Sequence, residues 1–206
     1  SYAAERVQGQ VEGPGGAFEP ATIDRHPDVQ RMLLSMRAGT EAIRAVAYYT
    51  GAALDMARRH PDADVRNAKQ ALVDLLIPVV KAWATDTGLT VANTAMQVLG
   101  GTGYIEESGA PQFFRDLRVA AIWEGTNGIQ ALDLVGRKVA RDRGDAAGAL
   151  IADMRTLEAD LADHTGVEDL DVIGSALQKA VVALDKATHW IVKTNTESPQ
   201  IVAASA

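Results

Sequence analysis

Apolar residues recur at helical spacing through most of this chain. A stretch rich in Gly and Pro at residues 10–24 favours a loop. The phrase His26-Pro27-Asp28 then has the features of a helix start, with proline at the first helical position. The predicted helix runs to about Arg59, before His60-Pro61, and its apolar positions are Val29, Leu33, Met36, Ile43, Val46 and Leu54.

The same spacing predicts further helices along the chain. A second long helix is expected from about Ala63 to Val98, ended by the glycines of residues 100–103. A short helical turn follows at residues 111–118, and Asn127 opens a third long helix that Gly144 ends. Gly166 then separates two apolar series, at residues 150–161 and 170–191, which indicates a helical hairpin.

We therefore predict an all-α fold, because no pair of strands with convincing turn chemistry can be found. The expected architecture is an up-and-down helical bundle over residues 1–143, with an appended helical hairpin over residues 144–206. Low aromatic content (5%) and the dominance of Ala and Leu agree with helices.

Composition limits the possible partners. The net charge of -7 disfavours nucleic acid and anionic membrane surfaces, and no apolar run is long enough to span a bilayer. The absence of cysteine excludes disulfides and thiolate chemistry and is compatible with a cytoplasmic protein. The four histidines show no metal-ligand spacing, so no metal is expected. The chain starts without Met, which suggests a fragment or a processed piece.

One carboxylate has unusual neighbours, in the stretch Ile122-Trp123-Glu124-Gly125-Thr126-Asn127-Gly128-Ile129-Gln130. A carboxylate in apolar company loses hydration as an anion, which suits a general base. The residues alone also allow a plain alternative, in which Glu124 is a surface charge near a helix start and Thr126 and Asn127 are capping residues.

The glycines of Gly100-Gly101-Thr102-Gly103 also allow two interpretations. A Rossmann or P-loop site is rejected, because a helix rather than a strand precedes them. They can form a helix C-cap and a tight turn, or a wall whose missing side chains let a ligand approach the backbone.

Taken in order, three motifs resemble the C-terminal domain of acyl-CoA dehydrogenases: the segment from Gln97 to Tyr104, the pair Arg115-Asp116, and residues 122–130. Tyr2, Arg6, Gln8 and Gly9 resemble the phrase that opens that domain. The resemblance covers residues 1–143. The rest resembles the helical extension of the larger bacterial members, a group that includes 3-methylmercaptopropionyl-CoA dehydrogenases.

This resemblance implies FAD-dependent α,β-dehydrogenation of an acyl-CoA substrate, with electrons passed on to an electron-transfer acceptor. Glu124 matches the family's catalytic base, and Gly125 would lie against the acyl-CoA. The resemblance assigns the FAD contacts to Arg6, at the pyrophosphate, and to Gln97, Gly100, Gly101, Thr126 and Asn127. Several FAD contacts cross a subunit boundary in this family, so a homo-oligomer is implied.

The family's N-terminal helical domain and its middle β-domain have no counterpart in these 206 residues. We therefore expect that this chain alone neither retains FAD nor turns over substrate. Two alternatives stay open. The chain could be a helical assembly module without catalysis, supported by the heptad-like hairpin after Leu150. It could also belong to an acyl-CoA oxidase, which uses the same base and flavin but passes electrons to oxygen.

Overall fold

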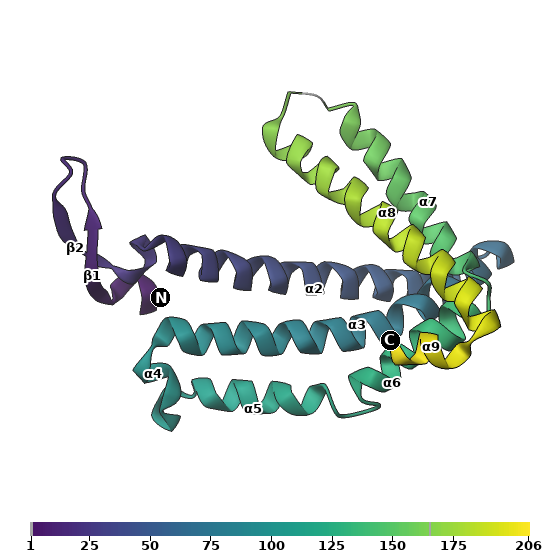
Figure 1. The fold of residues 1–206 in the computed structure, drawn as a ribbon, viewed down its shortest axis with the longest axis horizontal. Coiled ribbons are helices and arrows are strands. Elements are labelled where there is room, and N and C mark those ends of the chain that lie inside the picture. The colour runs from purple at the N-terminus through teal and green to yellow at the C-terminus, as the bar shows by residue number, and fades with distance from the viewer. Residues whose placement is uncertain (1, 165) are drawn as a thin grey trace. The chain divides into compact units, whose positions relative to one another are not determined.

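The structure, a computed structural model, describes residues 2–164 and 166–206. It confirms the all-α class: long helices dominate, and the described strands form one small hairpin (Figure 1). The elements in chain order are α1 (Tyr2–Glu5), β1 (Val7–Glu12), β2 (Phe18–Thr22), η1 (Ile23–Arg25), α2 (Pro27–Arg59), α3 (Ala63–Leu99), α4 (Gly101–Tyr104), η2 (Glu106–Ser108), α5 (Ala110–Ala120), α6 (Asn127–Leu132), η3 (Asp133–Ala140), α7 (Asp145–Ala162), α8 (Glu168–Glu197) and α9 (Pro199–Ala204).

The chain divides into two compact units, and each contains parts of α2 and α3. Unit 1 consists of Ser1–Ala47 and Lys81–Thr126, and unit 2 of Tyr48–Val80 and Asn127–Ala206. The predicted starts and ends of both long helices are confirmed to within a residue. Pro27 begins α2, where a proline loses nothing because its missing N–H would have no partner inside the helix.

The prediction of a loop at residues 10–24 was wrong, because the structure has an antiparallel hairpin there. Strand β1 pairs with β2, and the turn is closed by the Gly13 N–H, which donates to the Ala17 carbonyl at 2.8 Å. Most side chains of the two strands are exposed, and Ala21 of β2 is the buried one. Apolar and polar positions therefore do not alternate, and backbone pairing left no hydrophobic signal in the sequence.

Unit 2 is held together by two clusters of buried apolar side chains. Leu72, Val73 and Leu76 of α3 pack with Ala53 of α2. A neighbouring cluster joins Leu75, Val139 and Ala147, and Leu150 of α7 packs against both clusters. Burying each of the Leu and Val side chains contributes roughly 1.5–3 kcal/mol, so this part of α3 anchors the unit.

The predicted helical hairpin is confirmed as α7 and α8, which lie side by side in unit 2 (Figure 1). Arg155 of α7 donates to Asp185 of α8 at 2.9 Å, and Val181 is almost fully buried at 1% exposure. The two helices thus pack against each other, while Leu157, Ile173 and Leu184 of the two series are exposed. This is the simpler outcome for a pattern that also permitted an assembly module.

The third long helix differs from the expectation of one continuous α-helix. It begins at Asn127 as predicted but changes at Asp133 into a π-helix that ends at Ala140. Gly144, with φ +84°, then starts α7. Apolar spacing in so short a segment does not distinguish a π-helix from an α-helix, and π segments are uncommon enough that the pattern favours α.

Candidate active site

Glu124 lies in the turn between α5 and α6, at residues 121–126, which we call the base loop. Glu124 and Gly125 both have positive φ, at 53° and 87°. The left-handed region costs a residue with a side chain roughly 1–2 kcal/mol, whereas glycine adopts it readily. The conformation at Glu124 is therefore held by its surroundings, as strained residues at functional sites often are.

The prediction that apolar neighbours remove water from Glu124 was wrong for the described chain. The Glu124 side chain is exposed. Its apolar neighbours Trp123 and Ile122 are 67% and 51% exposed. Adjacent apolar residues in a turn point outward here, so sequence proximity does not desolvate the carboxylate.

Hydrogen bonds hold the base loop at both ends. The N–H groups of Ile122 and Trp123 donate to the Val119 carbonyl at 2.9 and 2.8 Å, which closes the turn after α5. The ammonium Nζ of Lys81, a partly buried residue of α3, donates to the Gly125 carbonyl at 2.6 Å. A charged donor makes this contact roughly twice as strong as a neutral hydrogen bond.

Sequence reasoning missed Lys81. A signal was present, because Lys81 is the single charged residue within an apolar run from Leu75 to Ala84. A cation in that setting needs an acceptor, and the Gly125 carbonyl supplies one.

Three residues expected to contact FAD come together at one cavity of about 400 Å³ in unit 1. Arg6, Gln97 and Gly100 line it. Ile23 and His26 lie on its walls too, and His26 Nε2 is 2.8 Å from the Gln8 carbonyl. We call this the Arg6 cavity. Its lining combines a guanidinium, an amide and exposed backbone.

The glycine segment at residues 100–103 divides into two roles. Gly100 (φ +59°) and Gly101 are exposed, and a Cβ added at either would meet no atom within 4 Å. Gly103 is buried, and a Cβ there would collide with the Met96 carbonyl and lie 2.9 Å from Leu99 Cβ. The last glycine therefore serves packing, whereas the first two leave open backbone.

The base loop and the Arg6 cavity lie apart in unit 1. Lys81, which contacts the base loop, and Gln97, which lines the cavity, are on the same helix. A rise of about 1.5 Å per residue separates them by roughly 24 Å along the helix axis. Thr126 ends the base loop in unit 1, whereas Asn127 is the first residue of α6 and belongs to unit 2.

The Arg115-Asp116 pair of the motif set has a structural partner in Glu106. Arg115 donates to both Glu106 carboxylate oxygens, at 2.8 and 2.9 Å. These hydrogen bonds hold the pKa of Glu106 below its usual value. The ion pair of Arg115 and Glu106 therefore stabilises the turn before α5 at pH values above the ordinary pKa of a glutamate. This stabilisation is lost as the pH falls through the lowered pKa of Glu106. Both side chains are exposed, so the effect is small.

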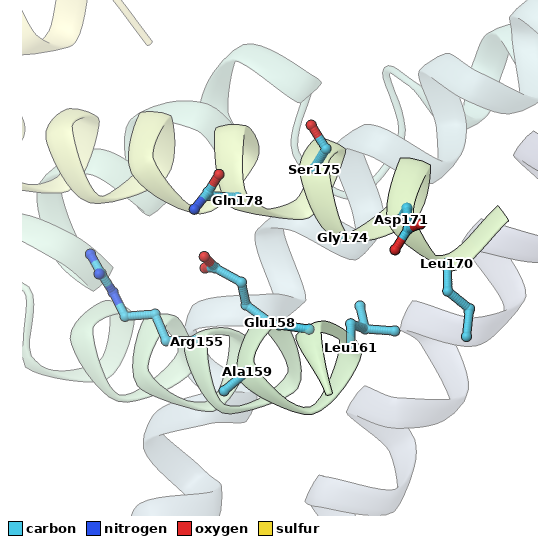
Figure 2. A pocket seen from close by; sticks show the side chains of 10 residues that line it. Arg155, Glu158, Ala159, Leu161, Leu170, Asp171, Gly174, Ser175 and Gln178 are labelled. Carbon is cyan, nitrogen blue, oxygen red and sulfur yellow. The ribbon is translucent and has the colours of Figure 1, made fainter. Parts of the chain in front are cut away.

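A further cavity, of about 420 Å³, lies between α7 and α8 and contains none of the predicted site residues. Figure 2 shows Glu158 and Leu161 extending from α7 toward α8. Acidic, basic and apolar side chains share its walls, which gives it no clear preference for one ligand. Among residues 2–164 and 166–206, no cluster of His, Asp or Glu could hold a metal ion. None of the helices in this described part has the length and apolar character to cross a membrane.

Comparison with known families agrees with the motif order. The family model described as "Acyl-CoA dehydrogenase, C-terminal domain" matches residues 17–140, more than half of the chain. The chain belongs to the acyl-CoA dehydrogenase family. The match includes α2, α3, the glycine segment and the base loop.

Individual acyl-CoA dehydrogenases extend the similarity. The chain is 44% identical over 162 residues to the 3-methylmercaptopropionyl-CoA dehydrogenase of Ruegeria pomeroyi, covering 79% of this chain and 27% of that protein. It is 36% identical over 149 residues to the broad-specificity linear acyl-CoA dehydrogenase FadE5 of Mycobacterium tuberculosis, covering 70% and 24%. The chain thus spans about a quarter of the length of these relatives.

The appended helices are shared too. A butyryl-CoA dehydrogenase of Syntrophomonas wolfei is 28% identical over 203 residues, which cover 98% of this chain and 33% of that protein. A solved structure, "Bd2924 apo-form", matches with a TM-score of 0.59 at 21% identity and covers 99% of this chain and 36% of that one. At that identity the likeness shows the fold alone.

We predict that Gly103→Ala destabilises the chain, because the added methyl group collides with the end of α3. Overpacking of this kind costs about 1–3 kcal/mol. Urea unfolding followed by circular dichroism measures the change. Gly101→Ala is the matched control on the same short helix, and its free energy of unfolding should match or slightly exceed that of the wild type. Equal stability of both variants would contradict the division of roles.

Proposed function

We propose that this chain is the base-bearing C-terminal part of a flavin-dependent acyl-CoA dehydrogenase that introduces an α,β double bond into an acyl-CoA thioester. The observation that carries the proposal is the base loop itself. By its motif Glu124 matches the family's catalytic base, and it lies within the residues that the family model covers. The residue has a positive φ and an exposed carboxylate.

Glu124 would remove the α-proton of the bound thioester, and its carboxylate would carry that proton after the step. A general base contributes about 10²- to 10⁴-fold when it is held within hydrogen-bond reach of the proton. Gly125 lacks a side chain, so the thioester can approach the loop closely beside the base. FAD, when bound, supplies the acceptor for the β-hydride.

The residues of the Arg6 cavity fit the pyrophosphate and adenosine parts of FAD. The Arg6 guanidinium can donate paired hydrogen bonds to phosphate oxygens. Gln97 offers both a donor and an acceptor to a base or sugar. The open backbone at Gly100 and Gly101 lets a flat group approach without a side chain in the way. We assign further FAD contacts to Thr126 and Asn127 by their match to the family motif.

A homo-oligomer is part of the proposal. Within one copy, about 24 Å of helix separates the base loop from the Arg6 cavity. This separation supports an arrangement in which one copy binds one end of FAD and another copy binds the other end. Unit 1 also exposes apolar side chains at and next to the base loop, namely Val119, Ile122 and Trp123. Such surfaces typically become covered in assemblies. Coverage would also exclude water from Glu124, which the isolated chain does not do.

The wider assignments follow from the same membership. We propose residues 1–143 as the family bundle and residues 144–206 as an extension of it. The partners would be an acyl-CoA substrate and an electron-transfer acceptor, in a cytoplasmic enzyme. Hydrogen peroxide formed in proportion to turnover would instead identify an acyl-CoA oxidase.

In the full-length, FAD-loaded enzyme, Glu124→Gln should lower kcat by about 10²- to 10⁴-fold, because an amide cannot accept the α-proton. The bound flavin, measured by its visible absorbance, should stay at the wild-type level. Glu107→Gln is the matched control, since Glu107 is an exposed glutamate of unit 1 outside the base loop. Near-normal turnover by Glu124→Gln would refute the assigned role.

The 206-residue chain purified alone should carry no stoichiometric flavin and show no dehydrogenation of acyl-CoA. The described residues supply the Arg6 cavity and the base loop, which contact α3 at positions far apart, Gln97 and Lys81. In this family the flavin ring is normally held by the β-domain, which these residues do not include. The measurement is the visible flavin absorbance of the purified chain. A yellow protein with one FAD per chain would overturn this expectation.

A further inference from the structure

The base loop depends on a contact from a distant helix. Lys81 Nζ donates to the Gly125 carbonyl at 2.6 Å, across 44 positions of sequence. The acceptor belongs to the residue immediately after Glu124. This contact is therefore placed to set the orientation of the peptide that follows the proposed base.

The backbone at this point needs such a restraint. Glu124 and Gly125 are consecutive residues with positive φ, and a glycine has easy access to several other conformations. On the α5 side, the Ile122 and Trp123 N–H groups fix the turn by donating to the Val119 carbonyl. Without Lys81 the loop would lose the charge-assisted hydrogen bond that restrains it at Gly125.

Lys81 itself is well anchored. It lies within α3 and is partly buried. Its backbone carbonyl accepts a hydrogen bond from the Thr85 hydroxyl at 2.9 Å. A compact ammonium group can donate to a single carbonyl oxygen, and the hydrogen bond to Gly125 holds its flexible stem in one position.

We propose that Lys81 is a positioning residue for the dehydrogenation reaction: its ammonium group, bonded to the Gly125 carbonyl, holds the base loop so that the Glu124 carboxylate meets the substrate α-proton. This inference rests on the proposed role of Glu124. Lys81 touches neither substrate nor cofactor in this proposal. It acts through the backbone next to the base.

The test is Lys81→Met in the full-length, FAD-loaded enzyme, because Met approximates the length of Lys but has no donor. We expect kcat to fall about 10- to 100-fold, since a misplaced catalytic group costs rate in this range. KM for acyl-CoA and the FAD content should change much less than kcat, because Arg6, Gln97 and Gly100, to which FAD contacts are assigned, lie at the Arg6 cavity and outside the base loop. Lys81→Arg keeps a cationic donor and should recover most of kcat.

Lys69→Met is the matched control, since Lys69 is a partly buried lysine nearer the start of the same helix. Its kcat should equal that of the wild type. A folded, FAD-containing Lys81→Met enzyme with kcat within about twofold of the wild type would overturn the proposal. If that variant does not fold, Lys81→Gln replaces it under the same criterion.

Glu124→Gln, assayed in parallel, separates two kinds of failure. An active Glu124→Gln enzyme would remove the proposed function and the positioning role with it. An inactive Glu124→Gln enzyme beside a fully active Lys81→Met enzyme would remove only the role of Lys81.

Discussion

The hydrogen bond from Lys81 to the Gly125 carbonyl joins the base loop to a long helix. Two successive residues of this loop have positive φ, one of them a glutamate that does not favour it. Local sequence alone would let such a turn relax into other conformations. The long-range bond, together with the turn closed on Val119, explains how a glutamate on an exposed loop can have a defined position.

The described chain positions the Glu124 carboxylate but does not remove water from it. Glu124 and its apolar neighbours are exposed, whereas a general base works best in a site from which water has been excluded. The Arg6 cavity lies roughly 24 Å along α3 from the base loop. Both observations are consistent with a site completed by further protein, as the proposed oligomer would do.

Helices were predictable because their signals are local. Apolar spacing, Pro27 and the glycines at residues 100 and 166 marked the long elements closely. The β1–β2 hairpin was missed because it is held by backbone pairing with exposed side chains. The π-helix η3 was missed because spacing in a short segment does not separate it from an α-helix.

The site was predictable in part. Motif order identified the family, and the structure brings Arg6, Gln97 and Gly100 to one cavity, while their assigned contacts with FAD stay a prediction. The shelter of Glu124 was inferred wrongly, since side-chain direction in a turn is not encoded by neighbouring letters. Lys81 was missed because its acceptor is a backbone carbonyl far along the chain, and such an acceptor has no residue signature.

The central claim is that Glu124 moves the α-proton of a bound acyl-CoA. The most direct measurement is α-proton exchange with D₂O in the anaerobic enzyme with its flavin already reduced, followed by mass spectrometry of the recovered acyl-CoA. With hydride transfer blocked, only proton transfer is observed. The wild type should incorporate deuterium at the α-carbon and Glu124→Gln should not; exchange by Glu124→Gln at the wild-type rate would contradict the account.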